Sequence, residues 1–293
     1  MSVPSEAVAQ DLVRVGLDCG SRSYLMDDSA IGRYVHGLEE PHPFYLERSP
    51  FGGRIAPSLI RHSEVYEDRR WYLPNLHGFL HAKQEFDLFT PINAGERIST
   101  HTFVAERYSK RDRDYVVCES LALGEDGRIC VRGRTHQSFL NPEVAAAAEP
   151  VTGSRREGRR FAVGELPAQE DLAPIIKNVN IEMCRNFSGP RVNLHNDLEK
   201  ARSLGFPNVL VQGMFSICLL SELLTRRFGA GWICGGKFTV SLVNPVWVDE
   251  TVIARARVLE RVREGDGERA MMEVWCEKAD ATVIVVGRAS AVL

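Results

Sequence analysis

Alternation of apolar and polar residues predicts two groups of β-strands in this chain. In the first group the alternation covers 81–89, 98–107, 114–123 and 129–139. A period of two residues places one side of each strand in the core and the other toward solvent. The last two strands are separated by Glu125-Asp126-Gly127, an Asp-Gly sequence typical of a tight hairpin turn. We therefore expect consecutive antiparallel strands, and an earlier apolar stretch at 12–17 is a candidate lead-in strand.

Other segments have the pattern of helices. Asp27-Asp28-Ser29 offers a helix cap before Ala30, Ile31, Tyr34 and Val35, which share one helical face. Asp197 caps a second short helix that Gly205 stops. From Gly213 the stretch 214–224 is apolar almost all round, as expected for a helix buried against a sheet.

The second half of the chain repeats the first. Thr90-Pro91-Ile92 with Glu96 and Ile98 matches Asn244-Pro245-Val246 with Glu250 and Val252, 154 residues later. Gly133-Arg134 and Gly287-Arg288 match with the same separation. Cys118-Glu119 and Cys276-Glu277 match with a slightly longer one, which suggests hairpins of different length. The repeat indicates a duplicated unit in which a curved antiparallel sheet wraps round one buried helix.

Composition divides the chain at a linker. Residues 141–170 combine an Asn-Pro pair, an alanine run and an Arg/Gly-rich segment. We assign residues 1–145 to an N-terminal domain, 146–170 to the linker and 171–293 to a C-terminal domain. The proportions of apolar residues, 44%, and charged residues, 26%, are those of a globular protein with real cores.

Charge and cysteine usage exclude several classes of function. The net charge of −3 comes without a sustained basic run, so we expect neither nucleic acid nor a membrane surface as a partner. No apolar run is long enough to span a bilayer, and the amino end has no signal pattern. Seven scattered cysteines without metal-ligand spacing predict buried free thiols. These features favour a cytoplasmic protein.

One motif carries the candidate chemistry. Ser188-Gly189, Leu194-His195, Asp197, Ala201, Gly205-Phe206 and Gly213 follow one another in a turn-rich segment that leads to the apolar helix. This segment resembles the hydratase motif of the MaoC-like enoyl-CoA hydratases and dehydratases. The chain departs from that motif where Pro190 takes the place of the catalytic Asp and Val192-Asn193 replaces Asn-Pro.

The resemblance extends to the N-terminal half. Glu40-Pro41-His42-Pro43-Phe44-Tyr45 and the later Gly53-Arg54-Ile55-Ala56-Pro57 resemble the motifs of a dehydratase domain of that family. The resemblance therefore implies an α+β double hotdog, in which two antiparallel sheets each wrap round a long central helix. The N-terminal half would hold the substrate, and the C-terminal half would be catalytic.

The implied reaction interconverts a 2-enoyl thioester and a 3-hydroxyacyl thioester by addition or removal of water, without a cofactor. By the resemblance, His195 would move the proton, and the amide of Gly213 at the helix start would polarise the thioester oxygen. The missing Asp leaves the second acid–base group open among Asn193, Asp197 and Glu40. Asn193 is equally suited to the turn, Asp197 to capping its helix, and Glu40 to a solvated surface position.

Further residues are expected to contact the substrate. Gln212 and Met214 flank Gly213, Tyr45 stands at the histidine position of the N-terminal motif, and Glu40 at its Asp position. The expected ligand is a thioester of coenzyme A or of an acyl carrier protein. We also expect a homodimer or higher homo-oligomer.

Two alternatives remain open. A hotdog thioesterase would need a carboxylate near the thioester, for which Glu222 and Glu40 are candidates. A non-catalytic acyl-thioester-binding subunit is favoured by Pro190. Metal binding is not expected, because the spaced pair His77 and His81 has no third ligand nearby in the sequence.

Overall fold

The computed structural model describes residues 12–73, 79–141, 144 and 161–293. Its strands are β1 (Asp18–Leu25), β2 (Ile55–Ala56), β3 (Leu80–Leu88), β4 (Ile92–Asn93), β5 (Arg97–Lys110), β6 (Arg113–Leu123), β7 (Ile129–Leu140), β8 (Glu170–Asp171), β9 (Ile175–Asn178), β10 (Lys237–Leu242), β11 (Thr251–Glu264), β12 (Gly267–Lys278) and β13 (Val283–Val292). Its helices are α1 (Asp28–Leu38), α2 (Pro43–Leu46), the 3₁₀ helix η2 (Glu64–Glu67), α4 (Ile181–Ser188), α5 (Leu198–Ser203), α6 (Gly213–Phe228) and α7 (Ala230–Ile233).

A single antiparallel sheet runs through both halves of the molecule. Its strand order is β1-β5-β6-β7-β3-β10-β13-β12-β11-β8, with β9 also paired to β11. The halves meet where β3 pairs with β10, for example Glu85 opposite Thr239. The expectation of two separate sheets is therefore wrong, because the two edge strands at the centre hydrogen-bond to each other and leave no gap.

The register of the sheet repeats with the separation of 154 residues that the sequence indicates. Strands β5 and β11 both have a β-bulge, between Val104 and Glu106 in the first and between Val258 and Glu260 in the second. Phe86 faces Gly133 across one strand pair, and Val240 faces Gly287 across its counterpart. The duplication is thus preserved down to single residue pairs.

The longer separation assigned to Cys118 and Cys276 is wrong. Cys118 pairs with Val104, whereas Cys276 pairs with Ala254. The residue that occupies the position of Cys118 in the second sheet half is Met272, which pairs with Val258. The shared Cys-Glu sequence is coincidental, because hairpins of equal length keep the separation constant.

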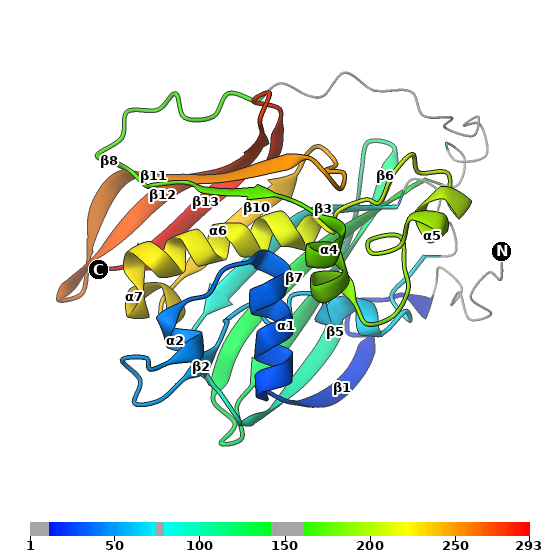
Figure 1. The fold of residues 1–293 in the computed structure, drawn as a ribbon. Coiled ribbons are helices and arrows are strands. Elements are labelled where there is room, and N and C mark those ends of the chain that lie inside the picture. Colours follow the sequence, from blue (N-terminus) through cyan, green and yellow to red (C-terminus); the bar gives the residue numbers. More distant parts are fainter. Residues whose placement is uncertain (1–11, 74–78, 142–143, 145–160) are drawn as a thin grey trace.

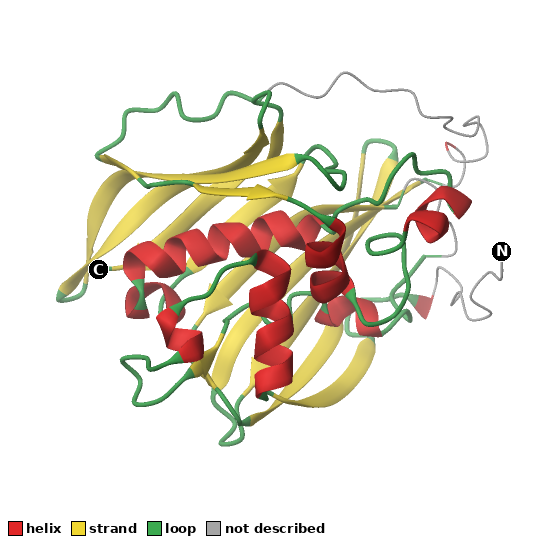
Figure 2. Ribbon diagram, viewed as in Figure 1, coloured by secondary structure: helices red, strands yellow, loops and turns green. Residues whose placement is uncertain are grey.

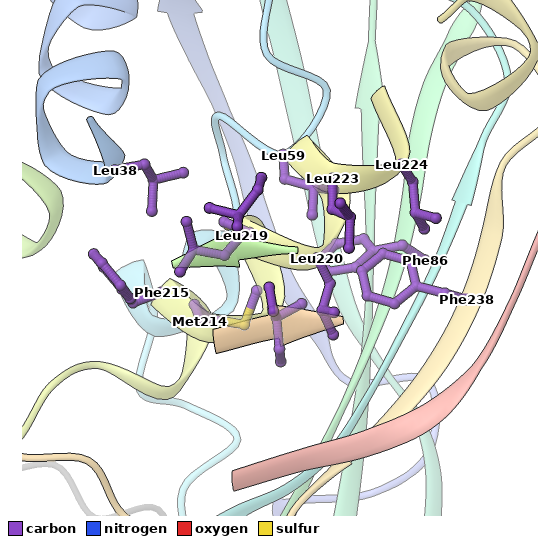
Figure 3. Packing of buried hydrophobic residues seen from close by; sticks show 14 of the residues in the cluster. Leu38, Leu59, Phe86, Met214, Phe215, Leu219, Leu220, Leu223, Leu224 and Phe238 are labelled. Atoms are coloured by element: carbon purple, nitrogen blue, oxygen red, sulfur yellow. The ribbon is translucent and has the colours of Figure 1, made fainter. Parts of the chain in front are cut away.

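Helix α6 lies along one face of the sheet, with α1 and α4 beside it (Figures 1 and 2). Its residues from Met214 to Thr225 are buried. Figure 3 shows Leu220 close to Phe86 and Phe238, which come from the two halves; their rings lie 5.7 Å apart. One hydrophobic core therefore joins the two halves.

Only the C-terminal half has a long central helix among the described residues. In the N-terminal half, the segment that corresponds to the start of α6 follows β2. It forms turns and the short helix η2 and no long helix. The expectation of one long helix in each half is therefore wrong. The segment holds Pro57 and the buried charged residue Glu64, so it lacks the all-apolar surface of α6.

Most of the other expected elements are present. Asp27 caps α1 and Asp197 caps α5, and the alternating stretches form β3, β5, β6 and β7. The strand expected at 12–17 is wrong: this stretch is irregular, and the first strand begins at Asp18. Residues 146–160 of the expected linker 146–170 lie outside the described residues, and the domain boundaries stay a prediction. No helix in the described ranges is long and apolar enough to cross a bilayer.

Candidate active site

A cleft of about 320 Å³ lies between the two halves at the amino end of α6. The N-terminal half contributes side chains from α1, including Tyr34, and from the segment that holds His62 and Ser63. The C-terminal half contributes the end of α4 with Ser188, and Gln212 just before α6. The volume is within the range of small-molecule sites. This cleft is the candidate active site.

The turn after α4 is held in shape by two asparagines. The Asn193 side chain accepts a hydrogen bond from the His195 amide at 2.8 Å and donates to the carbonyls of Ser188 and Arg191, both at 2.9 Å. Asn196 is buried and accepts from the Asn193 amide at 2.8 Å. These bonds fix the loop that presents His195. Asn193 thus has the turn role, and a role in orienting water stays a prediction.

The ring of His195 is in a defined tautomer. Its Nδ1 lies 2.8 Å from the carbonyl oxygen of Leu210, which can only accept, so Nδ1 carries the hydrogen. Nε2 is then the unprotonated nitrogen of the neutral ring. His195 is not among the residues that line the cleft, so its access to a substrate there stays a prediction. Burial lowers the pKa of His195 below its ordinary value of 6.5. The ring is therefore neutral near pH 7, the form that accepts a proton.

Helix α6 begins beside the cleft without a capping side chain. Gln212 is its N-cap residue, and its side chain makes no cap hydrogen bond. The first amides of a helix, here those of Gly213 and Met214, have no partner within the helix, but neither residue lines the cleft. A Cβ on Gly213 would lie 2.3 Å from Cδ2 of Leu242, so the glycine also allows β10 to pack closely. The side chain of Met214 lies in the core.

Gln212 instead connects the halves through a chain of hydrogen bonds. Its Nε2 donates to Ser63 Oγ at 2.8 Å, and its Oε1 accepts from the Ser188 hydroxyl at 3.1 Å. Ser63 Oγ lies 2.6 Å from Nδ1 of His62. The Ser63 hydroxyl donates to His62 when Nδ1 is the unprotonated nitrogen of that ring. Desolvation, and secondarily the charge of Arg61, lower the pKa of His62 to about 3, so this ring stays neutral.

Two predicted substrate contacts lie elsewhere in the structure. Glu40 is buried and forms ion pairs with Lys177 at 2.8 Å and with Arg226. It is not the solvated residue that its charge suggests. The Tyr45 hydroxyl donates to Oε2 of Glu222 at 2.8 Å. Neither side chain is part of the cleft lining.

Glu222 is itself a core residue. Tyr34 donates to its Oε1 at 3.1 Å, opposite the bond from Tyr45, and only 2% of Glu222 is exposed. Burial raises the pKa of Glu222 to about 8. Neither Glu222 nor Glu40 lines the cleft, so neither carboxylate named for the thioesterase alternative is placed there; the carboxylate among the lining residues is Glu67.

The remaining predicted residues have separate places. The carboxylate of Asp197 accepts from the Lys200 amide at 2.7 Å, which is the helix cap. Pro190, where the family has Asp, lines the cleft. Within the described ranges no group of three metal-ligating side chains occurs; His81 lies on β3 and His77 is outside those ranges.

Sequence reasoning missed the polar triplet Arg61-His62-Ser63. Arg61 lines the cleft, binds Glu64 through Nε and Nη2, and lies 3.6 Å over the Tyr24 ring. The only signal was a polar triplet directly after an apolar run ending at Ile60. Nothing in the sequence connects Ser63 with Gln212, 149 positions later, because the fold alone brings them together.

Comparisons with known proteins agree with this architecture. Residues 160–279 match the family model described as a MaoC like domain. A solved MaoC-like dehydratase is 15% identical, with 96% of this chain and 98% of that chain covered and a TM-score of 0.70. A MaoC-like dehydratase from Phytophthora capsici is 18% identical, with 96% and 97% covered and a TM-score of 0.67.

A conserved hypothetical protein from Mycobacterium tuberculosis, described as having a double hotdog fold, is 13% identical, with 95% and 96% covered and a TM-score of 0.64. A comparison with curated proteins gave no match. At these identities the solved structures establish a shared fold. The family model independently supports the resemblance seen in the sequence.

Proposed function

We propose, on the premise that this chain belongs to the MaoC-like hydratases and dehydratases through the domain in residues 160–279, that it adds water to a 2-enoyl thioester or removes it from a 3-hydroxyacyl thioester. The observation that carries the proposal is the tautomer of His195. Its Nδ1 hydrogen is used by the Leu210 carbonyl, so Nε2 is the proton acceptor that water addition requires.

The start of α6 would supply the second requirement. As water attacks C3 of the enoyl group, negative charge develops on the thioester oxygen. Free amides at a helix start stabilise such charge, with the help of the helix dipole. The amides of Gly213 and Met214 are in this position, directly after the cleft residue Gln212.

Proton balance is possible with one imidazole. Nε2 of His195 would take a proton from water while the hydroxide bonds to C3. The resulting imidazolium would return that proton to C2, which restores neutral His195 and completes the 3-hydroxyacyl product. The reverse sequence gives dehydration. No acid at position 190 is needed in this scheme.

An exposed arginine favours a phosphate-bearing acyl carrier. Arg33 lines the cleft and is exposed to solvent, whereas the second arginine of the lining, Arg61, is already paired with Glu64. Coenzyme A and the prosthetic arm of an acyl carrier protein both have phosphate groups, which guanidinium groups bind well. The acyl chain itself is unspecified by these contacts.

The test is hydration of crotonyl-CoA and longer enoyl-CoAs, followed by the loss of ultraviolet absorbance. We expect His195→Ala to lower kcat/KM about 100-fold or more, the usual contribution of a general acid–base group. His36→Ala is the matched control, because His36 is exposed on α1 and lies outside the motif that carries His195. Undiminished turnover by His195→Ala would refute the proposed mechanism.

A second candidate function is non-catalytic binding of acyl thioesters, which Pro190 favours by removing the acid of the family motif. The same proteins decide between the two. Tight binding of enoyl-CoA without turnover in the unaltered protein would support the binding function.

A further inference from the structure

We infer that His62 and Ser63, from the N-terminal half, are positioning residues that hold Gln212 and thereby orient the first turn of α6 toward the cleft. The inference rests on the proposed function and adds two residues that the family motif in this chain does not include. Its basis is the hydrogen-bond chain that starts at Ser188 and ends at His62.

With the hydrogen of the His62 ring on Nε2, the chain has a single direction. The Ser188 hydroxyl donates to Gln212 Oε1, Gln212 Nε2 donates to Ser63 Oγ, and the Ser63 hydroxyl donates to Nδ1 of His62. Each group donates to the next one. Removing the final acceptor, Nδ1 of His62, would leave the Ser63 hydroxyl hydrogen without this partner. Connected hydrogen bonds in a site of low polarity are stronger together than singly.

The acceptor at the end is fixed by packing. The His62 ring is stacked on Phe187 with centroids 4.2 Å apart and planes at 6°. Phe187 in turn lies against Gly37, where a Cβ would be 3.0 Å from the Phe187 Cα. The contact between α1 and α4 therefore determines where Nδ1 of His62 stands, and through it where Gln212 stands.

Gln212 is suited to transmit this position. It precedes Gly213 and is the N-cap of α6, so its backbone sets the direction in which the first amides point. Its side chain makes no bond to its own helix and instead bonds to both sides of the cleft. Catalysis depends steeply on such geometry, and an error of 1 Å can reduce a rate about 100-fold.

His62 acts through its neutral ring in this arrangement. A ring that stays neutral neither delivers nor keeps a proton during turnover, so its contribution is a fixed acceptor. Substitutions at His62 should accordingly change kcat without moving the pH dependence that His195 sets. This separates a positioning residue from a second acid–base residue.

Three variants separate the acceptor from the ring. His62→Phe keeps the stacking on Phe187 and removes the acceptor; His62→Asn keeps an acceptor near Nδ1 and removes the ring; Ser63→Ala breaks the chain one step earlier. We expect His62→Phe and Ser63→Ala to lower kcat about 10- to 100-fold with KM nearly unchanged. We expect His62→Asn to keep most of the kcat. In all three variants, the acid limb of the pH–rate profile should stay at the wild-type pH.

Thermal unfolding of the same variants controls for a general loss of structure. Wild-type kcat in folded Ser63→Ala and His62→Phe would overturn the inference and leave the proposed function intact. An acid limb that moves in the His62 variants would also overturn it, because His62 would then be titrating. Equal losses in His62→Asn and His62→Phe would assign the effect to the ring and overturn the role of the acceptor.

A readout without turnover covers the case in which the proposed function fails. Nitrogen-15 spectra of the His62 ring report its tautomer directly, and we expect hydrogen on Nε2 and an acceptor Nδ1 in the wild-type protein. Ser63→Ala should shift the Nδ1 resonance and the Gln212 side-chain amide together. Unchanged resonances, or hydrogen on Nδ1, would contradict the inference whether or not the protein hydrates enoyl thioesters.

Discussion

The tautomer of His195 makes its activity depend on pH in a defined way. The ring acts as a base only when neutral, and burial lowers its pKa below the ordinary 6.5. Protonation then occurs at lower pH than for an exposed histidine. We predict that kcat/KM for enoyl-CoA hydration stays high down through pH 6.5 and falls only below it. An acid limb centred at or above 6.5 in the pH–rate profile would contradict this.

Glu222 makes stability depend on pH in the opposite direction from a carboxylate whose pKa is lowered by an ion pair. Its folded pKa of about 8 exceeds the ordinary 4.5, so the folded state binds one more proton than the unfolded state between these values. The contribution of Glu222 to the free energy of unfolding is therefore fully present below about pH 4.5 and is lost as the pH rises toward 8. The slope is about 1.4 kcal/mol per pH unit.

Glu222→Gln should remove that slope, because the amide keeps the buried shape and does not titrate. We predict that the variant loses less stability than the wild-type protein between pH 5 and 8, measured by urea unfolding at several pH values. Tyr34→Phe is a useful comparison, since it removes one donor and leaves the carboxyl group in place. Parallel pH curves for wild type and Glu222→Gln would show that Glu222 does not titrate in this range.

At the scale of elements, the contact between α6 and β10 explains why residue 213 is glycine. The position that a Cβ would occupy is filled by Leu242 Cδ2, at 2.3 Å. We predict that Gly213→Ala destabilises the protein by about 1–3 kcal/mol, the usual effect of overpacking, and reduces hydration activity because the helix start shifts. Thermal unfolding and steady-state kinetics measure the two effects.

The double variant Gly213→Ala with Leu242→Val tests the origin of the loss. Valine lacks the Cδ atoms, so the space is restored, and we expect both stability and activity to recover in part. A stable double variant that remains inactive would show instead that the Cβ itself obstructs the thioester.

The elements differ in how far local sequence determines them. Strands β5 and β6 follow from alternation, and α1 and α5 follow from the caps Asp27 and Asp197. The segment after β2 was not predictable in this way. Its counterpart in the C-terminal half is a long helix because 214–224 is apolar all round. The sequence around Pro57 has no local pattern that predicts turns at this place.

One motif in the sequence holds the predicted catalytic residues. The turn with His195 and the helix start at Gly213 are close in the chain, and the roles assigned to them stay predictions. The Gln212 partner Ser63, by contrast, comes from the other half of the molecule. The partners of Glu40 and Tyr45 were likewise not predictable: their positions in a motif suggested substrate contacts, whereas in the structure they are buried and bond to Arg226, Lys177 and Glu222.

At the scale of the molecule, the two halves share both a sheet and a core. Strands β3 and β10 pair from Lys83–Ser241 to Asp87–Lys237, and one hydrophobic cluster includes residues of both halves. We predict that the protein unfolds in one cooperative transition, with calorimetric and van't Hoff enthalpies in agreement. Differential scanning calorimetry provides the measurement, and two resolved transitions would show that the halves fold independently.

The constant separation of 154 residues across the strands has an evolutionary consequence. An insertion or deletion inside a strand would shift every later side chain to the opposite face, so natural variation is confined to the segments above the helical face. There the two copies differ: the C-terminal one has the long helix α6, and the N-terminal one has turns and the short helix η2. New substrate preferences in descendants of this chain should therefore arise from changes near residues 57–67 and 186–214, while the β-framework stays constant in length.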